Sequence, residues 1–215
     1  MDFTELMKIK SYFFIKRLFD IVFSFLLMIM LSWLYIVIAL VILISSGYPI
    51  FYADKRVGKN GKTISVFKFR TMINNAQDNI KNLLTPEEYN TWEREHKLNN
   101  DPRVTKVGRI LRKLSMDELP QLLNIFFGSM SFVGPRPITF LELNKYFNQK
   151  EKEKLLSVKP GLISLWSVYG RSDVLFSDGK RQAIELEYFN HCNLWFDFKL
   201  IIKVIPNVIL CKGAR

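Results

Sequence analysis

The stretch IVFSFLLMIMLSWLYIVIALVILI, from Ile21 to Ile44, decides the architecture of this chain. Every residue in it is apolar or is a serine, tryptophan or tyrosine, and none carries a formal charge. As one straight helix at about 1.5 Å per residue it would reach roughly 36 Å, more than the ~30 Å hydrocarbon core of a bilayer. The sequence therefore predicts a membrane helix over residues 21–44.

Two other interpretations of the apolar run are weaker. A secretory signal peptide has a shorter apolar core and a nearby cleavage site of small residues, whereas this run is longer and follows the polar and basic residues 1–20. A buried helix of a soluble protein usually keeps a polar stripe, and we expect none in this run. A retained membrane segment is the interpretation that we carry forward.

Positive charge on both sides of the run bears on how it enters the membrane. Basic residues mark cytosolic flanks, and here they are Lys8, Lys10, Lys16 and Arg17 before the run and Lys55, Arg56, Lys59 and Lys62 after it. A re-entrant hairpin turning near Ser32 would keep both flanks in the cytosol, although a full span is also geometrically possible. We divide the chain into a basic N-terminal segment, 1–20, this membrane helix, and a cytosolic catalytic domain, 45–215.

The remaining composition limits the functional classes. A chain of 215 residues holds one ordinary domain and an anchor. Its 31 Lys and Arg against 20 Asp and Glu give a net charge of +11, which attracts anionic lipid, nucleotide phosphates or nucleic acid. The isolated Cys192, Cys211, His96 and His191 indicate no zinc site and fit a reducing compartment.

Local patterns predict a mixed α/β fold that is mostly helical. Residues 50–57 and 63–70 form a hairpin turning at Asn60-Gly61, with Lys68 and Arg70 on one face of the second strand. A capping box at Thr85 starts a polar helix that runs to about Leu98.

Two further segments have amphipathic helical patterns. Basic residues recur at every third position beside an apolar side at Arg103, Lys106, Arg109 and Arg112. This stripe either is solvated, facing water or lipid headgroups, or binds phosphate. The segment from Leu194 to Leu210 is predicted as a helix lying along the membrane interface, with a buried core helix as the alternative.

The sequence from Ser115 to Pro120, SMDELP, allows two interpretations. In the first, Ser115 caps a helix and Glu118 completes the capping box, which leaves no chemistry. Pro120 would then lie inside the helix, where it removes a hydrogen bond and clashes with the preceding turn. In the second, the helix starts at Pro120, and Asp117 and Glu118 lie in irregular backbone just before it.

In the second interpretation the two carboxylates could hold Mg²⁺. This ion typically takes one or two protein carboxylates together with substrate phosphates, and Arg109 and Arg112 could neutralise the remaining phosphate charge. A carboxylate can also attack phosphorus directly. Arg136, between two prolines in Gly134-Pro135-Arg136-Pro137, suits a bidentate oxyanion contact, or it is an exposed arginine on a rigid turn.

Together these motifs resemble the bacterial sugar transferase family, the monotopic phosphoglycosyl transferases, over nearly the whole chain from Lys16 onward. The resemblance is carried by the ordered set KRLFD at 16–20, KFRTM at 68–72, DPR at 101–103, SMDELPQ at 115–121, SFVGPRP at 131–137, KPGL at 159–162, GRS at 170–172 and DFK at 197–199. The family usually has Ser-Pro at its membrane bend, where this chain has Ser32-Trp33.

The resemblance implies a function and assigns roles to residues. It implies a magnesium-dependent enzyme on the cytosolic face of the bacterial inner membrane that transfers a sugar 1-phosphate from a UDP-sugar to undecaprenyl phosphate. The implied mechanism has two steps and passes through a covalent enzyme, with Asp117 as nucleophile and Glu118 as Mg²⁺ ligand. The remaining assignments are to substrate phosphates or supporting contacts: Arg112, Arg136, Arg171, Lys68, Arg70 and Asp197. The run at 170–174 resembles the branch of the family that acts on simple hexoses such as glucose or galactose.

A rival class is a membrane-tethered protein that binds anionic lipid or nucleotide without turnover, in which the Asp-Glu pair only caps a helix. We expect no nucleic-acid partner, because the basic residues are not interleaved with aromatic residues and no DNA-binding module is present. An enzyme with a soluble acceptor would leave the apolar run unexplained.

Overall fold

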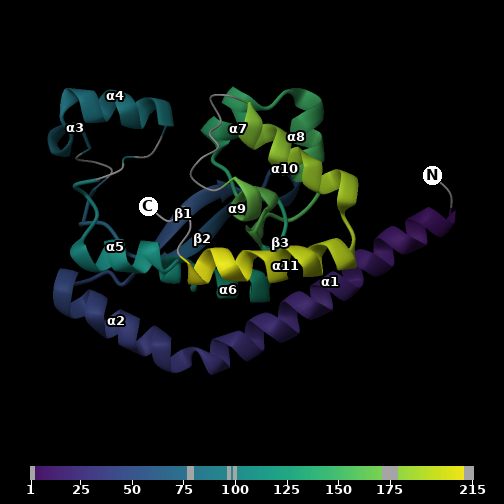
Figure 1. Ribbon diagram of the computed structural model, residues 1–215, viewed down its shortest axis with the longest axis horizontal. Coiled ribbons are helices and arrows are strands. Elements are labelled where there is room, and N and C mark those ends of the chain that lie inside the picture. The colour runs from purple at the N-terminus through teal and green to yellow at the C-terminus, as the bar shows by residue number, and fades with distance from the viewer. Residues whose placement is uncertain (1–2, 77–79, 96–97, 99–100, 171–178, 211–215) are drawn as a thin grey trace.

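The computed structural model describes residues 3–76, 80–95, 98, 101–170 and 179–210. A bent pair of helices runs beneath the rest of the chain, which packs on one side of it (Figure 1). The helices are α1 (Phe3–Met30), α2 (Ser32–Ser46), α3 (Ile80–Leu83), α4 (Pro86–Glu95), α5 (Lys106–Lys113), α6 (Gln121–Phe127), α7 (Phe140–Tyr146), α8 (Gln149–Leu156), α9 (Leu165–Tyr169), α10 (Lys180–His191) and α11 (Leu194–Ile209). The strands are β1 (Phe51–Val57), β2 (Thr63–Phe69), β3 (Ser131–Val133) and β4 (Gly161–Ile163), and two 3₁₀ turns cover Lys59–Gly61 and Met116–Glu118. The prediction of a mostly helical mixed fold with a small β-hairpin is confirmed.

The apolar run is broken, not straight. α1 includes most of residues 1–20 and the first part of the run, and the chain leaves helical geometry at Leu31, with φ −96° and ψ 6°. The two arms, Lys10–Met30 and Ser32–Ser46, bend by 61°, so they form an open V and not a closed hairpin (Figure 1). The break lies one residue before the predicted turn and needs no proline. Among the described residues no single helix is long and apolar enough to cross a membrane, whereas the two arms together meet that test.

Polar side chains fasten α1 to the domain above it. The Asp20 carboxylate, 2% exposed, accepts a hydrogen bond from the backbone N–H of Phe132 in β3 at 3.0 Å. Arg17 donates to the carbonyls of Ile125 and Phe126 at 2.6 and 2.7 Å, at the C-terminal end of α6 where carbonyl groups lack helical partners. The helix therefore has a buried polar side, which continues into the apolar run at the fully buried Ser24. Within residues 21–44 this polar side consists of Ser24 alone, since Arg17 and Asp20 precede the run.

The second arm packs under the hairpin. Ile38 and Ile42 of α2 form an apolar cluster with Phe69 of β2 and Leu111 of α5. The hydroxyl of Tyr35 donates to the backbone carbonyl of Leu119. Because of the bend, α2 thus contacts the segment that directly follows the Met116–Glu118 turn.

The predicted hairpin is confirmed. β1 and β2 pair antiparallel from Phe51 opposite Phe69 to Val57 opposite Thr63. The connecting turn uses Asn60 and Gly61 at φ 59° and 74°, the left-handed backbone that these two residue types tolerate best.

A second sheet was not predicted from the sequence. β3 and β4 pair in parallel, with Ser131 opposite Gly161 and Val133 opposite Ile163. The two backbones meet so closely that a Cβ on Gly161 would lie 2.1 Å from the amide nitrogen of Gly134. Glycine at 161 is therefore required for the crossing that places the segment from Gly134 to Pro137.

The helix predictions hold in part. The Thr85 hydroxyl and the Glu88 carboxylate cap α4 reciprocally as expected, and α4 ends at Glu95. α5 starts only at Lys106, after Thr105 as its N-cap. Arg103 therefore precedes the helix and does not belong to its cationic face. Instead its guanidinium is buried and pairs with Asp101 at 2.6 Å, a structural ion pair.

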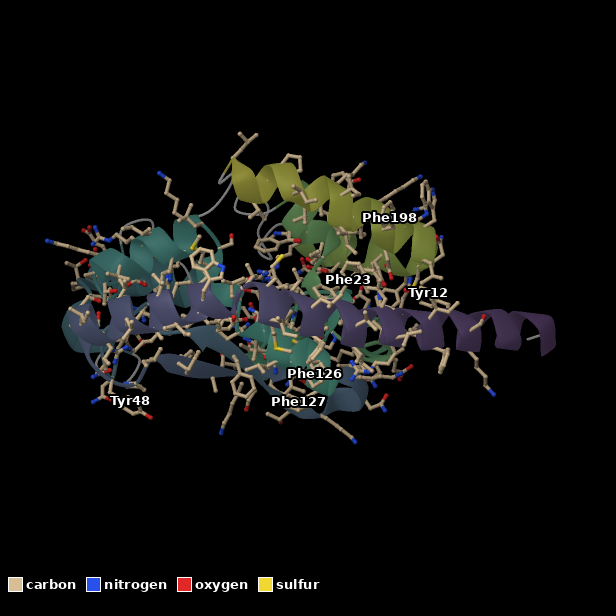
Figure 2. The ribbon with its side chains drawn as sticks, turned by 90° about the horizontal axis from the view of Figure 1, so that it is seen from below. Tyr12, Phe23, Tyr48, Phe126, Phe127 and Phe198 are labelled. Atoms are coloured by element: carbon tan, nitrogen blue, oxygen red, sulfur yellow. The ribbon has the colours of Figure 1, made fainter. Side chains whose placement is uncertain are left out.

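The main core lies between α6, β3, α9, α10 and α11, and α11 covers it with one face only. Leu200 is 1% exposed, whereas Trp195, Phe198 and Ile202 are 63%, 50% and 50% exposed. The core-helix alternative for residues 194–210 is therefore wrong, because the opposite face of α11 is an exposed apolar stripe. In the view from below, Phe198 lies on one side of α1 and the adjacent pair Phe126 and Phe127 on the other (Figure 2).

Candidate active site

The site is built around the 3₁₀ turn Met116–Glu118. Ser115 has a left-handed backbone, φ 55°, and makes no side-chain capping bond, so the capping-box interpretation is wrong. Pro120 is the N-cap of α6, which confirms that Asp117 and Glu118 precede that helix. They lie in a tight turn, not in irregular backbone, and this turn packs against β2 and α5.

Asp117 is a partly buried carboxylate surrounded by charge. Burial raises its pKa, and the neighbouring Glu118 carboxylate raises it further, while Lys68 and Arg112 oppose the rise. Its net pKa lies above the ordinary aspartate value. Three separate segments, β2, α5 and the turn itself, thus supply the charged groups that act on this carboxylate.

Arg112 and Lys68 are the two cations that act on Asp117. Arg112 reaches back from α5 to the Thr71 hydroxyl, with its Nε donating at 2.9 Å. Burial lowers the pKa of Lys68, while Glu118 and Asp117 favour its charged form. Burial also lowers the pKa of Arg112, and Asp117 opposes this effect.

Glu118 is paired with the arginine of the Gly-Pro-Arg-Pro segment. The Arg136 Nη2 atom donates to the Glu118 carboxylate at 2.8 Å, and its guanidinium lies 5.3 Å from the ring centroid of Trp166. The interpretation of Arg136 as an exposed arginine on a rigid turn is therefore wrong. A polar hollow opens beside this pair, lined by Asp54, Arg56, Val66, Lys68, Gln121, Arg136 and Pro137.

The other residues assigned from the sequence lie elsewhere or outside the described part. Arg70 donates to the carbonyls of Ser46 and Gly47 at 2.7 and 2.6 Å, so it holds the end of α2 and does not share the surroundings of Lys68. Arg109 is exposed on α5. Arg171 lies outside the described residues, and the substrate-binding roles of these three stay predictions.

Asp197 joins helices and not the carboxylate turn. It pairs with Lys16 of α1 and accepts from the hydroxyls of Tyr12 at 2.8 Å and Tyr188 at 3.0 Å. The Lys16 to Asp20 motif and Asp197 together dock α1 on the domain. The available sequence signal for this docking was the group of charged residues Lys16, Arg17 and Asp20 beside an apolar run, since charges there need partners.

The carboxylate pair fits a magnesium ion in its donor chemistry. Among the described residues no group of three or more His, Cys, Asp or Glu side chains is arranged to hold a metal. Magnesium needs only one or two carboxylates when phosphates complete its shell. Burial, and after it the negative charge of Glu118, raise the pKa of Asp117, and a cation held by both carboxylates would oppose both effects.

Two adjacent carboxylates with Lys68, Arg112 and Arg136 around them suit a phosphorylated substrate, and comparison with known proteins identifies the class of enzyme. The family model described as bacterial sugar transferase matches residues 11–211, and the chain belongs to this family.

Curated relatives point to particular members of the family. The chain is 42% identical over 201 residues to the exopolysaccharide production protein ExoY of Sinorhizobium fredii, covering 93% of this chain and 87% of the relative. It is 41% identical over 203 residues to the undecaprenyl-phosphate galactose phosphotransferase of Salmonella typhimurium, covering 94% of this chain and 42% of that protein. It is 36% identical over 206 residues to the UDP-glucose:undecaprenyl-phosphate glucose-1-phosphate transferase of Escherichia coli, covering 93% and 41%.

Proposed function

We propose that this enzyme transfers a hexose 1-phosphate from a UDP-hexose to undecaprenyl phosphate and releases UMP. The observation that carries the proposal is the partly buried Asp117 carboxylate, on which the charges of Lys68 and Arg112 act, next to Glu118 and its partner Arg136. A nucleophile lies there among cations that suit a diphosphate. The relatives named as undecaprenyl-phosphate galactose and glucose-1-phosphate transferases support the choice of donor and acceptor.

In the first step an Asp117 carboxylate oxygen attacks the sugar-bearing phosphorus of the UDP-hexose. A new P–O bond to the enzyme forms, and the bond from that phosphorus to the bridging oxygen breaks. The bridging oxygen leaves with the electron pair on UMP. Lys68, Arg112 and Arg136 face the charge that develops on the phosphate oxygens, and groups fixed in this way need little rearrangement during the reaction.

In the second step a phosphate oxygen of undecaprenyl phosphate attacks the same phosphorus. The bond to Asp117 breaks, the carboxylate is restored, and the lipid carries a diphosphate-linked hexose. A carboxylate needs no base to activate it. This suits the site, where the charged groups that act on Asp117 are the acid Glu118 and the cations Lys68 and Arg112.

Asp117 and Glu118 are the residues that would hold Mg²⁺. When bound, the ion would neutralise the charge of the substrate diphosphate. Glu118 is already oriented by Arg136, so its carboxylate is fixed before substrate arrives.

The bent helix pair supports a membrane placement for the site. Both arms expose large apolar side chains, including Phe14 at 73%, Trp33 at 62% and Ile44 at 86%. An open V that enters one leaflet and leaves on the same side keeps both basic flanks in the cytosol. α11 would then lie at the headgroups beside α1, and the turn at Met116–Glu118, tied to α2 through Tyr35, would meet the lipid phosphate near the surface.

Release of UMP from a panel of UDP-sugars tests the proposal. The purified protein is assayed with Mg²⁺, with and without undecaprenyl phosphate, beside Asp117→Asn. We expect lipid-dependent release from a hexose donor, lost in the variant. No release from any donor would reject the proposal in favour of a tethered binding protein.

A further inference from the structure

We propose that Glu185 is a positioning residue that acts through Arg136, fixing the backbone and ring platform from which Arg136 reaches the substrate phosphates. This inference rests on the proposed function, since it assigns Arg136 to phosphate. Glu185 lies on α10 and belongs to none of the motifs that identify the family in the sequence. Within the described part of the chain its hydrogen bonds go to Arg136 and Ser164, and not to Asp117 or Glu118.

Glu185 links two segments of the chain through its two carboxylate oxygens, and we call this pair of hydrogen bonds the bracket. The residue is 1% exposed, and its two carboxylate oxygens bind two different segments. Oε2 accepts from the backbone N–H of Arg136 at 3.1 Å, and Oε1 accepts from the Ser164 hydroxyl at 3.1 Å. A carboxylate buried this deeply is costly unless it is paired and hydrogen-bonded. The loop after β3 and the start of α9 are therefore held by one group.

Each bonded segment supports the same guanidinium. Ser164 is the N-cap of α9, and Trp166 in the first turn of α9 lies under the Arg136 guanidinium at 5.3 Å. Glu185 thus fixes the main chain of Arg136 directly and its aromatic platform through Ser164. At the other end of the side chain, Glu118 accepts from Nη2 at 2.8 Å. The arginine is held at its backbone, its face and its tip, which is the arrangement that a preorganised oxyanion contact requires.

The two cations that act on Glu185, Arg136 and Arg181, agree with this role. Arg181, one turn earlier on α10, also lies over Trp166, at 4.4 Å, and its charge acts on Glu185 together with that of Arg136. The guanidinium groups of Arg136 and Arg181 therefore both contact the Trp166 ring, near the buried Glu185 carboxylate. Glutamine at 185 can accept from the Arg136 N–H and donate to the Ser164 oxygen, so it keeps the bracket, whereas alanine removes both bonds.

A double-mutant cycle tests the inference. The variants are Glu185→Ala, Glu185→Gln, Arg136→Ala and Glu185→Ala/Arg136→Ala, measured for kcat/KM of UMP release and for affinity to UDP, which has the diphosphate but no sugar to transfer. We expect Glu185→Ala to lower kcat/KM by roughly tenfold to a hundredfold, and Glu185→Gln to stay within about threefold of wild type, because the bracket remains. In the Arg136→Ala background, the Glu185→Ala change should have no further effect on either quantity.

Controls separate positioning from a loss of fold. Glu187→Gln, an exposed residue on the same helix, should match wild type, and thermal unfolding reports the stability of each variant. Additive losses in the double variant would overturn the inference, because Glu185 would then act independently of Arg136. A loss in Glu185→Gln equal to that in Glu185→Ala would overturn it as well. If wild type releases no UMP, the proposed function fails, and the cycle in UDP affinity still decides the role of Glu185. Should Glu185→Ala not fold, Ser164→Ala takes its place in the cycle, because it removes the bond from the Ser164 hydroxyl to Glu185; a loss that persists in the Arg136→Ala background would overturn the inference.

Discussion

The guanidinium of Arg136 donates to the carboxylate of Glu118 at 2.8 Å, across 18 residues of sequence. This pair joins the turn that carries Asp117 to the loop that follows β3. Glu118 is therefore oriented before any substrate or metal arrives.

Asp117→Asn should abolish transfer by about three orders of magnitude or more while leaving the fold intact, because an amide oxygen is a poor nucleophile. Wild type incubated with a UDP-hexose carrying a radiolabelled sugar, without lipid, should retain label on the protein, and Asp117→Asn should not. Equal labelling of the two proteins, or wild-type turnover in the variant, would remove Asp117 from the role of nucleophile.

The acid limb of the pH profile should lie above the ~3.9 expected for an ordinary aspartate, because burial first, and Glu118 second, raise the pKa of Asp117. The nucleophile works ionised, so activity is lost as pH falls through this raised pKa. Lys68 lowers the pKa of Asp117. Lys68→Met should therefore move the limb of kcat/KM to higher pH, and Lys55→Met, an exposed lysine on β1, should leave it unchanged. A limb at or below the wild-type position in Lys68→Met would contradict the assignment.

Asp20→Ala should destabilise the protein by about 1–3 kcal/mol, since it leaves the buried N–H of Phe132 without its acceptor. Asp20→Asn keeps an oxygen at the same place and should cost less. Thermal unfolding of both variants in detergent measures the difference. Equal losses would show that the charge of Asp20, and not its acceptor oxygen, docks α1.

The two flanks of the bent pair should lie on one side of the membrane. Single cysteines are placed at Lys8 and at Lys62 in a chain whose native Cys192 and Cys211 are replaced by serine. A membrane-impermeant maleimide added to intact cells should label neither position, and both should react after permeabilisation. Labelling of either one in intact cells would reject the re-entrant placement.

The exposed stripe of α11 should hold the protein at the membrane interface. Phe198→Glu and Ile202→Glu each place a charge on that stripe and should shift the protein from the membrane fraction, or lower its binding to lipid vesicles, by roughly fivefold to tenfold each, about 1–1.4 kcal/mol of lost apolar burial. Leu141→Glu is the matched control, because Leu141 is 75% exposed and its helix α7 lies on the opposite side of the molecule from α1 and α2 (Figure 1). An equal loss of membrane binding in Leu141→Glu would contradict the interfacial position of α11.

Several elements of this fold are determined by residues that lie close together in the sequence. The hairpin at Asn60-Gly61 and the capping box at Thr85 depend on residues a few positions apart, and both formed as predicted. The same holds for the start of α6, because Pro120 can begin a helix but not continue one. The family motifs likewise identified the class of enzyme.

Only the tertiary structure decided what each charged motif residue does. Arg70 and Lys68 are two positions apart, yet Arg70 closes the end of α2 and Lys68 faces Asp117, because the strand ends between them. Arg103 fits a helical stripe but is buried against Asp101, and Asp197 fits a site motif but binds Lys16 of α1. Spacing along a chain fixes which side chains share a local face. Which distant partner a charge meets depends on how the elements pack, and burial of the pair then determines whether that charge is structural or free to meet substrate.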